Sequence, residues 1–261
     1  MKRIILAMTV GVAVMFASCS RKEPESSDAQ AKELLLYCGA GIRPPVAELT
    51  ETFGREQGVK IITDYAGGEV LISKIKLAQR GDLYMPGDRH YVNLAGEEGL
   101  ILSQKSVCYF VPTILVQKDN PKNISGLEDL LKPGVKLGLG DEKACAIGRK
   151  CKQIFARNNI PWTDVEKNLQ FQSLTVNELG MQIQAKALDA VIVWDAIARY
   201  YSDHGEEVPI RPEQNVISTV DIGVLKFVQD RELAEKFVEF VVSARGRDIF
   251  IKHNYTVDLP K

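Results

Sequence analysis

The sequence predicts an α/β fold made of two Rossmann-like lobes joined by two crossing strands. Between residues 33 and 201, short apolar runs alternate with segments of helical periodicity, which is typical of parallel strands covered by helices. Residues 107–121 and 216–230 break this alternation, because both are long, extended and apolar. We therefore expect them to be the paired crossings between two lobes, each built around its own sheet.

The predicted first lobe begins with the continuous apolar run 33–38, "ELLLYC", which fits a strand buried on both faces. A helix is predicted over 44–58, because its prolines suit a first helical turn, its apolar residues share one face and a glycine suits its end. A strand over 59–68, a helix over 69–81 and a strand over 82–88 follow.

The predicted second lobe repeats this pattern. Residues 135–141 form a strand that leads into a helix over 146–159, and residues 188–201 pass directly from strand to helix. The final helix, 231–254, would return to pack on the first lobe. The lobe boundaries that follow are 33–113 plus 221–261 for lobe I and 114–220 for lobe II. Two lobes on two crossing strands make a hinge, and the cleft between them suits closure on a small ligand.

The N-terminus has the pattern of an export signal. A basic dipeptide precedes the apolar run 4–16, which is too short for a membrane-spanning helix and is followed by small residues. The sequence "FASC", ending at Cys19, resembles the lipobox of bacterial lipoproteins, in which the cysteine carries the lipid. An ordinary signal peptide with a chance cysteine is the alternative. We predict a signal peptide over 1–18, a lipid-anchored flexible tether over 19–32 and a place on the outer side of a bacterial membrane.

Composition and motifs argue against several functions. The chain has 33 Lys and Arg residues against 34 Asp and Glu, so no basic excess indicates a nucleic-acid partner. Its 3 histidines have no metal-ligand spacing, and neither a P-loop nor a Gly-x-Ser-x-Gly sequence occurs. We therefore predict a protein that is not an enzyme and needs no cofactor.

Four cysteines follow Cys19, and their spacing is not that of a zinc site. In an oxidising compartment, Cys145 and Cys151 are the nearest candidates for a disulfide, whereas buried free thiols are the favoured alternative. Cys38 lies close to the predicted cleft and Cys145 lies just before a helix start. A thiol nucleophile or a soft ligand at the cleft is therefore a further hypothesis.

Several short segments place a helix start directly after a strand end, where it would face the cleft. These are "CGAGI" (38–42), "YAGGEV" (65–70), "DEKACAIG" (141–148), "SLTVNELG" (173–180) and "WDAIA" (194–198). Free amide donors and the positive end of the helix dipole attract anions, and glycine lets a ligand approach the backbone closely. The segments together predict a cage of donors for a dehydrated oxyanion, whose oxygens must regain the hydrogen bonds lost from water.

Three of these stretches also resemble a known family. "YAGGEVLISKI" with "GDLYMPGD", "GVKLGLGDEKACAIGRKCKQIF" and "VIVWDA" look like segments of periplasmic molybdate- or tungstate-binding proteins, the solute-binding components of ABC importers. The resemblance runs from about Leu34 to the C-terminus. It implies a type II periplasmic-binding fold, a monomer, a small oxyanion ligand and a partner permease. In the family, two serines, backbone amides and a tyrosine hydroxyl hold the oxyanion.

The resemblance carries over to this chain only in part. Gly41 and Gly68 stand at the positions of the two serines, so the amides remain and the hydroxyls are lost. Ile147 and Val176 fall where the family contributes amides, and Trp194 replaces the tyrosine with an indole N–H donor.

Three charged residues depart from the family pattern. Arg43 and Arg89 are additional donors near the predicted site, and Glu69 follows the second glycine directly. A carboxylate repels a dianion unless it is paired, protonated or bound to the metal. An archaeal tungstate-binding branch uses carboxylates as metal ligands, so Glu69 is either a direct ligand to the metal of the oxyanion or a solvent-facing residue at its helix start.

These observations together predict a lipid-anchored receptor that captures molybdate or tungstate between two closing lobes and passes it to an ABC permease. A receptor of the same fold for a thiophilic oxyanion or a metal complex, with Cys38 and Cys145 facing the cleft, is the first alternative. A secreted enzyme with a cleft thiol and a sensor subunit that signals to a membrane kinase are further alternatives.

Overall fold

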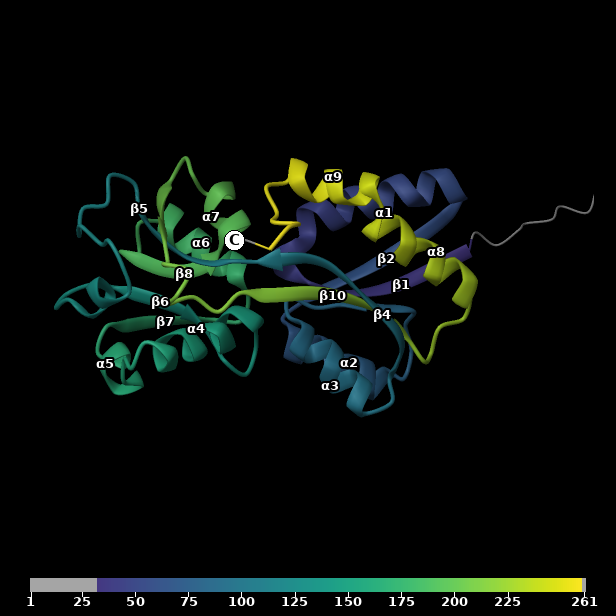
Figure 1. The fold of residues 1–261 in the computed structure, drawn as a ribbon, viewed down its shortest axis with the longest axis horizontal. Coiled ribbons are helices and arrows are strands. Elements are labelled where there is room, and N and C mark those ends of the chain that lie inside the picture. Colours follow the sequence, from purple (N-terminus) through teal and green to yellow (C-terminus); the bar gives the residue numbers. More distant parts are fainter. Residues whose placement is uncertain (1–31, 260–261) are drawn as a thin grey trace, which may run out of the picture. The chain divides into compact units, whose positions relative to one another are not determined.

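The computed structural model describes residues 32–259 and shows the two predicted lobes, each with its own five-stranded sheet (Figure 1). The predicted signal peptide, Cys19 and all but the last residue of the predicted tether lie outside the described residues. Lys32, the last tether residue, is the first residue of β1. Among residues 32–259, none of the helices combines the length and apolar character that crossing a bilayer requires.

The lobe I sheet has the strand order β2-β1-β3-β10-β4. These strands are β2 (Val59–Ala66), β1 (Lys32–Gly39), β3 (Leu83–Met85), β10 (Ser218–Leu225) and β4 (Ile101–Phe110). Its helices are the 3₁₀ turn η1 (Ala40–Ile42), α1 (Arg43–Gln57), α2 (Gly68–Ala78), α3 (Arg89–Glu97), α8 (Arg231–Val242) and α9 (Ala244–Lys252). Figure 1 shows α1, α8 and α9 on one face of this sheet and α2 and α3 on the other.

The lobe II sheet repeats this plan with the order β7-β6-β8-β5-β9. These strands are β7 (Leu169–Ser173), β6 (Leu137–Gly140), β8 (Ala190–Trp194), β5 (Pro112–Gln117) and β9 (Gly205–Pro209). Its helices are the 3₁₀ turn η2 (Glu128–Leu131), α4 (Ala146–Arg157), α5 (Trp162–Glu166), α6 (Val176–Gln184) and α7 (Asp195–Tyr200). In Figure 1, α4 and α5 cover one face and α6 and α7 the other.

The sheets are mixed, whereas the alternation in the sequence predicted parallel sheets. β1 pairs in parallel with β2 and β3, as β6 does with β7 and β8. One strand in each sheet runs the other way: β10 is antiparallel to its neighbours β3 and β4, and β5 is antiparallel to its neighbours β8 and β9. The two crossing segments were predicted correctly as extended. Their direction is reversed because each enters its sheet from the neighbouring lobe.

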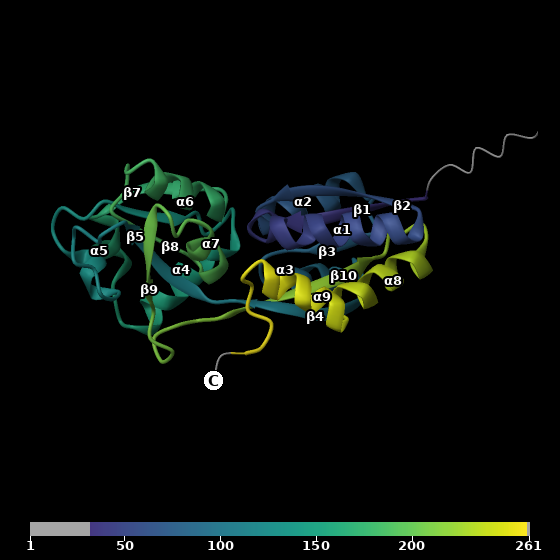
Figure 2. The same ribbon diagram turned by 90° about the horizontal axis from the view of Figure 1, so that it is seen from above.

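The predicted final helix is two helices, α8 and α9, which break at Ser243 (Figure 2). The Ser243 hydroxyl donates to the carbonyl of Phe240 and accepts from the amide of Gly246, so one side chain ends α8 and begins α9. A side chain at Gly246 would collide with the last carbonyls of α8. A serine that bonds to nearby backbone competes with a continuous helix, which the apolar periodicity did not reveal.

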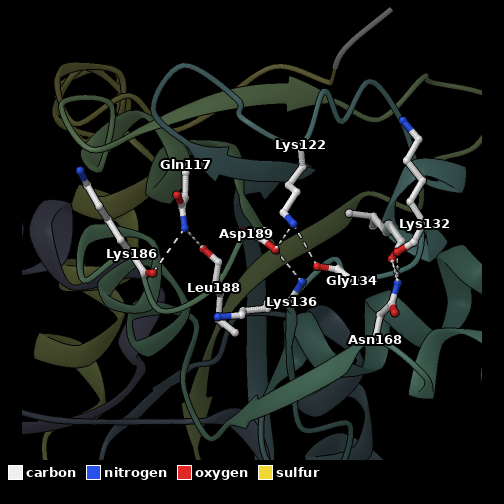
Figure 3. A network of polar contacts seen from close by, with 10 residues as sticks. Gln117, Lys122, Lys132, Gly134, Lys136, Asn168, Lys186, Leu188 and Asp189 are labelled. Atoms are coloured by element: carbon white, nitrogen blue, oxygen red, sulfur yellow. Dashed lines mark hydrogen bonds and ion pairs between the residues drawn. The ribbon is translucent and has the colours of Figure 1, made fainter.

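Side-chain hydrogen bonds fix one end of the lobe II sheet, where β6 and β8 begin and β5 ends (Figure 3). Asp189 accepts from the amide of Lys136 at 2.8 Å, and Gln117 donates to the carbonyl of Leu188 at 2.8 Å. Asn168 donates to the carbonyl of Lys132 at 2.8 Å. The bonds of Asp189 and Gln117 connect β8 to β6 and β5 at this end of the sheet. The opposite end of the sheet borders the cavity described below.

Candidate functional site

A small cavity of about 20 Å³ lies where strand ends and helix starts of the two lobes meet. Lobe I lines it with Gly39, Ala40, Gly41, Ala66, Gly67, Gly68, Gly87 and Phe110, and lobe II lines it with Cys145, Ala146, Ile147, Thr175, Val176 and Trp194. None of these lining residues carries a charged side chain. A charged guest would therefore be stabilised by backbone dipoles and neutral donors, not by an ion pair.

The cavity brings together five residues predicted from the sequence, although they come from both lobes and distant parts of the chain. They are Gly41, Gly68, Ile147, Val176 and Trp194. The indole of Trp194 is only 2% exposed and packs at a tilt against the ring of Phe110, with ring centroids 4.8 Å apart. Its N–H has no hydrogen-bond acceptor among residues 32–259, so it is available to a ligand in the cavity.

The three charged candidates do not line the cavity. The exposed guanidinium of Arg43 lies over the ring of Tyr65, 4.2 Å from its centroid. Arg89 is held by Asp221, with Nε 2.7 Å from the carboxylate. Glu69 is half-buried in the first turn of α2, and its side chain is not among the cavity walls. Within residues 32–259, no group of three or more His, Cys, Asp or Glu side chains is arranged to hold a metal ion.

The helices that start at the cavity leave their first amides without side-chain partners. α2 begins after Gly67, which has no side chain that could cap it. α4 begins after Cys145 and α6 after Thr175, and neither side chain accepts a capping hydrogen bond. In α2 the first intrahelical bond runs from the amide of Leu71 to the carbonyl of Gly67, so the preceding amides, that of Glu69 included, are free. The cavity is therefore surrounded by unsatisfied N–H donors, which suit an anion.

α7 contributes in a different way. Its first amide, that of Asp195, donates to the carbonyl of Val111 at 2.8 Å and is not available to a ligand. The sequence therefore predicted the correct segment, "WDAIA", but the donor that reaches the cavity there is the side chain of Trp194 rather than a helix amide.

The glycines allow the two lobes to approach each other closely. A β-carbon at Gly41 would lie 2.7 Å from a methyl carbon of Val176 and 3.3 Å from the Trp194 ring, and one at Gly67 would collide with the carbonyl of Ala144. All three neighbours belong to lobe II. A serine at position 41 would therefore overlap Val176 and press on the Trp194 ring in this arrangement of the lobes, whereas glycine fits.

Two buried tyrosine hydroxyls, which the sequence did not reveal, hold the site glycines. Tyr255 donates to the carbonyl of Gly41 at 2.6 Å, and Tyr84 donates to the carbonyl of Gly68 at 3.0 Å. Burial raises the pKa of both tyrosines well above the ordinary value, so both remain neutral donors at physiological pH. Both lie far in sequence from the glycine they hold, and no local motif connects them.

Asp88 joins the lobes beside the cavity. Its carboxylate lies 2.9 Å from Arg149 and 3.0 Å from Lys150, both on α4, and it also caps α3 by accepting from the amide of His90. Burial raises the pKa of Asp88, but Lys150, the His90 amide and Arg149 together lower it below the ordinary value. Asp88 therefore stays ionised, and this contact holds the start of α4 against lobe I.

The four cysteines of the described chain, Cys38, Cys108, Cys145 and Cys151, are buried free thiols, as the favoured alternative predicted. Only Cys145 lines the cavity. Burial raises the pKa of its thiol to about 11, although the amides of Gly148 and Ile147 act in the opposite direction. The thiol is therefore neutral, which argues against a nucleophile or an anionic soft ligand at this position.

Comparisons with known proteins agree with this geometry. A family model described as bacterial extracellular solute-binding protein matches residues 34–256. A Haemophilus influenzae protein named as a binding protein is 25% identical over 226 residues, which cover 87% of this chain and 91% of that protein. The molybdate-binding protein ModA of Mycobacterium tuberculosis is 23% identical over 238 residues, which cover 89% of each chain.

Solved structures share the two-lobed fold. The sulfate-binding protein SubI of Mycobacterium tuberculosis superimposes with a TM-score of 0.75 and 15% identity, covering 87% of this chain and 88% of its own. AfuA of Actinobacillus pleuropneumoniae, solved with fructose 6-phosphate, superimposes with a TM-score of 0.76 and 16% identity, covering 87% and 85%. The predicted type II periplasmic-binding fold is thus confirmed.

Proposed function

Because this chain belongs to the bacterial extracellular solute-binding protein family, we propose that it captures a fully deprotonated tetrahedral oxyanion, with molybdate and tungstate as first candidates. The bound anion would then pass to the permease of an ABC importer. The observation that carries the proposal is the cavity itself, which is surrounded by free helix amides and the Trp194 indole and contains no charged side chain. Relatives named for molybdate binding support the choice of ligand.

A cavity with several amide donors, the single hydroxyl of Thr175 and no carboxylate favours a fully deprotonated anion over a protonated one. Hydrogen phosphate brings an O–H group, which needs an acceptor when it leaves water. Molybdate, tungstate and sulfate bring only acceptor oxygens, which match the surrounding N–H groups. The carbonyls of Gly41 and Gly68 already accept from tyrosine hydroxyls and are poor alternative acceptors.

The apolar walls also favour an inorganic anion over an organic phosphate. Phe110, Ile147 and Val176 line the cavity, and a sugar or hydroxy-acid group placed against them would leave its hydroxyls without partners. The ligands named for relatives of similar fold, such as fructose 6-phosphate, would therefore bind this chain poorly.

Isothermal titration calorimetry at pH 7.5 tests the proposal, with molybdate, tungstate, sulfate, hydrogen phosphate and fructose 6-phosphate as ligands. We expect saturable binding of molybdate and tungstate, and binding about 10- to 100-fold weaker for hydrogen phosphate, because its O–H is left unsatisfied. Binding of hydrogen phosphate or fructose 6-phosphate in preference to both metal oxyanions would contradict the proposal.

We also propose that the mature protein is held at the membrane by a lipid on Cys19, which would keep the receptor near its permease. Mass spectrometry of the mature N-terminal peptide tests this proposal, because a diacylglyceryl-modified Cys19 has a characteristic mass. A mature chain that begins elsewhere, with Cys19 removed or unmodified, would contradict the anchor and leave the ligand proposal unaffected.

A further inference from the structure

The C-terminal segment 254–257 connects the two halves of the cavity. After α9 it turns toward the lobe that carries α6 and α7 (Figures 1 and 2). The amide of Tyr109, in β4, donates to the carbonyl of Thr256 at 2.7 Å and fixes the segment to lobe I. From there, Tyr255 donates its hydroxyl to the carbonyl of Gly41 at 2.6 Å. The segment thus holds one of the cavity glycines directly.

The next residue of the segment reaches lobe II. The hydroxyl of Thr256 donates to the carboxylate of Asp195 at 2.7 Å, and Arg199 donates to the carbonyl of Asn254 at 2.6 Å. Asp195 is 2% exposed and directly follows Trp194. Thr256 therefore contacts the residue adjacent to the side chain that donates into the cavity.

Asp195 is also bonded to the crossing between the lobes. Its amide donates to the carbonyl of Val111 at 2.8 Å, and its carboxylate accepts from the amide of Val111 at 3.4 Å. Val111 lies between β4 and β5, where the chain passes from lobe I to lobe II. Arg199 on α7 also pairs with this carboxylate, at 3.2 Å. Separating Thr256 from Asp195 therefore removes one of several partners of a buried carboxylate, and this loss opposes the lobe movement.

We propose that Tyr255 and Thr256 are positioning residues of the ligand site. Tyr255 sets the backbone at Gly41, and Thr256, through Asp195, sets the indole of Trp194, so that donors from both lobes are aligned when the cleft is closed. This inference rests on the proposed function. It predicts that removing either hydroxyl weakens ligand capture even though neither residue supplies a donor to the ligand.

The rings around Tyr255 provide a conservative test. Tyr255 packs against Phe110 and Phe250, with ring centroids 5.8 Å and 6.2 Å away. Tyr255→Phe keeps this packing and removes only the hydroxyl. Thr256→Val removes the hydroxyl at nearly constant shape, and Thr256→Ser retains it and should restore the bond to Asp195.

The chain has 2 tryptophans, so a Trp162→Phe background leaves Trp194 as the only indole fluorophore. Trp162 lies on α5 beside Lys152 and Glu166 and not at the cavity. In this background we would measure molybdate and tungstate affinity by calorimetry, and Trp194 emission with and without ligand. We expect Thr256→Val and Tyr255→Phe each to weaken binding about fivefold to tenfold, and Thr256→Ser to stay within about twofold of the parent.

Trp194 emission, measured without ligand, reports the surroundings of the indole in the folded protein. It therefore distinguishes a displaced Trp194 from a variant that is only less stable. We expect Thr256→Val to shift the emission of the folded protein and Thr256→Ser to leave it unchanged. Parent-like affinity and emission in Thr256→Val would overturn the inference, as would equal losses in Thr256→Ser and Thr256→Val. If the parent itself binds none of the oxyanions, the proposed function fails, and the ligand-free emission alone decides whether Thr256 positions Trp194.

Discussion

Three helices whose first residues line the cavity lack the side-chain cap that three other helices of the described chain carry. α3, α8 and α9 are capped by the side chains of Asp88, Asp230 and Ser243, whereas α2, α4 and α6 begin at the cavity without a side-chain cap. A capping side chain usually stabilises a helix by about 1 kcal/mol. The chain forgoes this stabilisation where several helices converge, and the unpaired amides that result are the donors proposed for the ligand.

The largest expected effect comes from adding a charged cap at the cavity. Thr175→Asp should cap α6 and raise the melting temperature, because an N-cap carboxylate accepts from helix amides. The same carboxylate would repel a bound dianion, so affinity for molybdate should fall on the order of 1000-fold. Calorimetry and thermal unfolding measure the two effects together.

Two variants serve as controls for this change. Thr175→Asn offers a cap without the charge and should retain much more affinity than Thr175→Asp. Asp230→Ala removes the cap of α8, far from the cavity, and should lower stability by about 1 kcal/mol without changing affinity. A Thr175→Asp protein that binds molybdate like the wild type would show that the start of α6 is not part of the site.

The next effect concerns the close approach of the lobes. Gly41→Ala places a β-carbon 2.7 Å from Val176, so the closed cleft must open slightly and molybdate affinity should fall about 30-fold, as for overpacking a tight contact. Because Gly41 has no left-handed backbone angle, the fold itself should tolerate alanine. Gly96→Ala, where a β-carbon meets nothing within 4 Å, is the matched control and should leave affinity unchanged.

A smaller effect is expected at the side-chain donor. Trp194→Phe keeps an aromatic ring against Phe110 and removes the indole N–H, so affinity should fall about tenfold, the contribution of one hydrogen bond to a charged group. Calorimetric titration measures the loss. An unchanged dissociation constant would place the Trp194 N–H outside the binding shell.

The smallest expected effect is a pH dependence at the lobe contact of Asp88. Its folded pKa is lowered, so its contribution to stability is present above the ordinary aspartate pKa of about 3.9 and is lost as the pH falls through the lower folded value. Urea unfolding of the wild type and Asp88→Asn measures this contribution. The difference in unfolding free energy should be largest above about pH 5 and should shrink below about pH 4. A difference that does not change with pH would show that the charge of Asp88 does not stabilise the fold.

The sequence carried enough local information to predict most of the elements that surround the cavity. The run 33–38 is a buried strand because its side chains are apolar on both faces, and the strand-to-helix segments at Gly68, Ile147 and Val176 follow from glycine and from helical periodicity. Parallel strands place such segments at one edge of a sheet. From this rule we predicted that the helix starts of both lobes face one common cleft.

Residues distant in sequence were not predicted, because their roles depend on contacts that no local pattern encodes. The charged candidates Arg43, Arg89 and Glu69 were predicted because they depart from the family pattern near the expected site, yet their side chains lie outside the cavity walls. Conversely, Tyr84 and Tyr255 are ordinary core aromatics in the sequence. Only the fold places their hydroxyls under the carbonyls of Gly68 and Gly41.

The sequence alone determined the strand and helix segments, the two extended crossings and the glycines at the helix starts, because periodicity and backbone preference act over a few residues. Only the tertiary structure decided that the crossing strands run antiparallel, that Ser243 divides the last helix and that Thr256 bonds to Asp195. These features depend on contacts between segments that are distant in the sequence. Hydrogen-bond partners of that kind are selected by the packing of the whole chain, because each buried polar group must find whichever partner the fold brings to it.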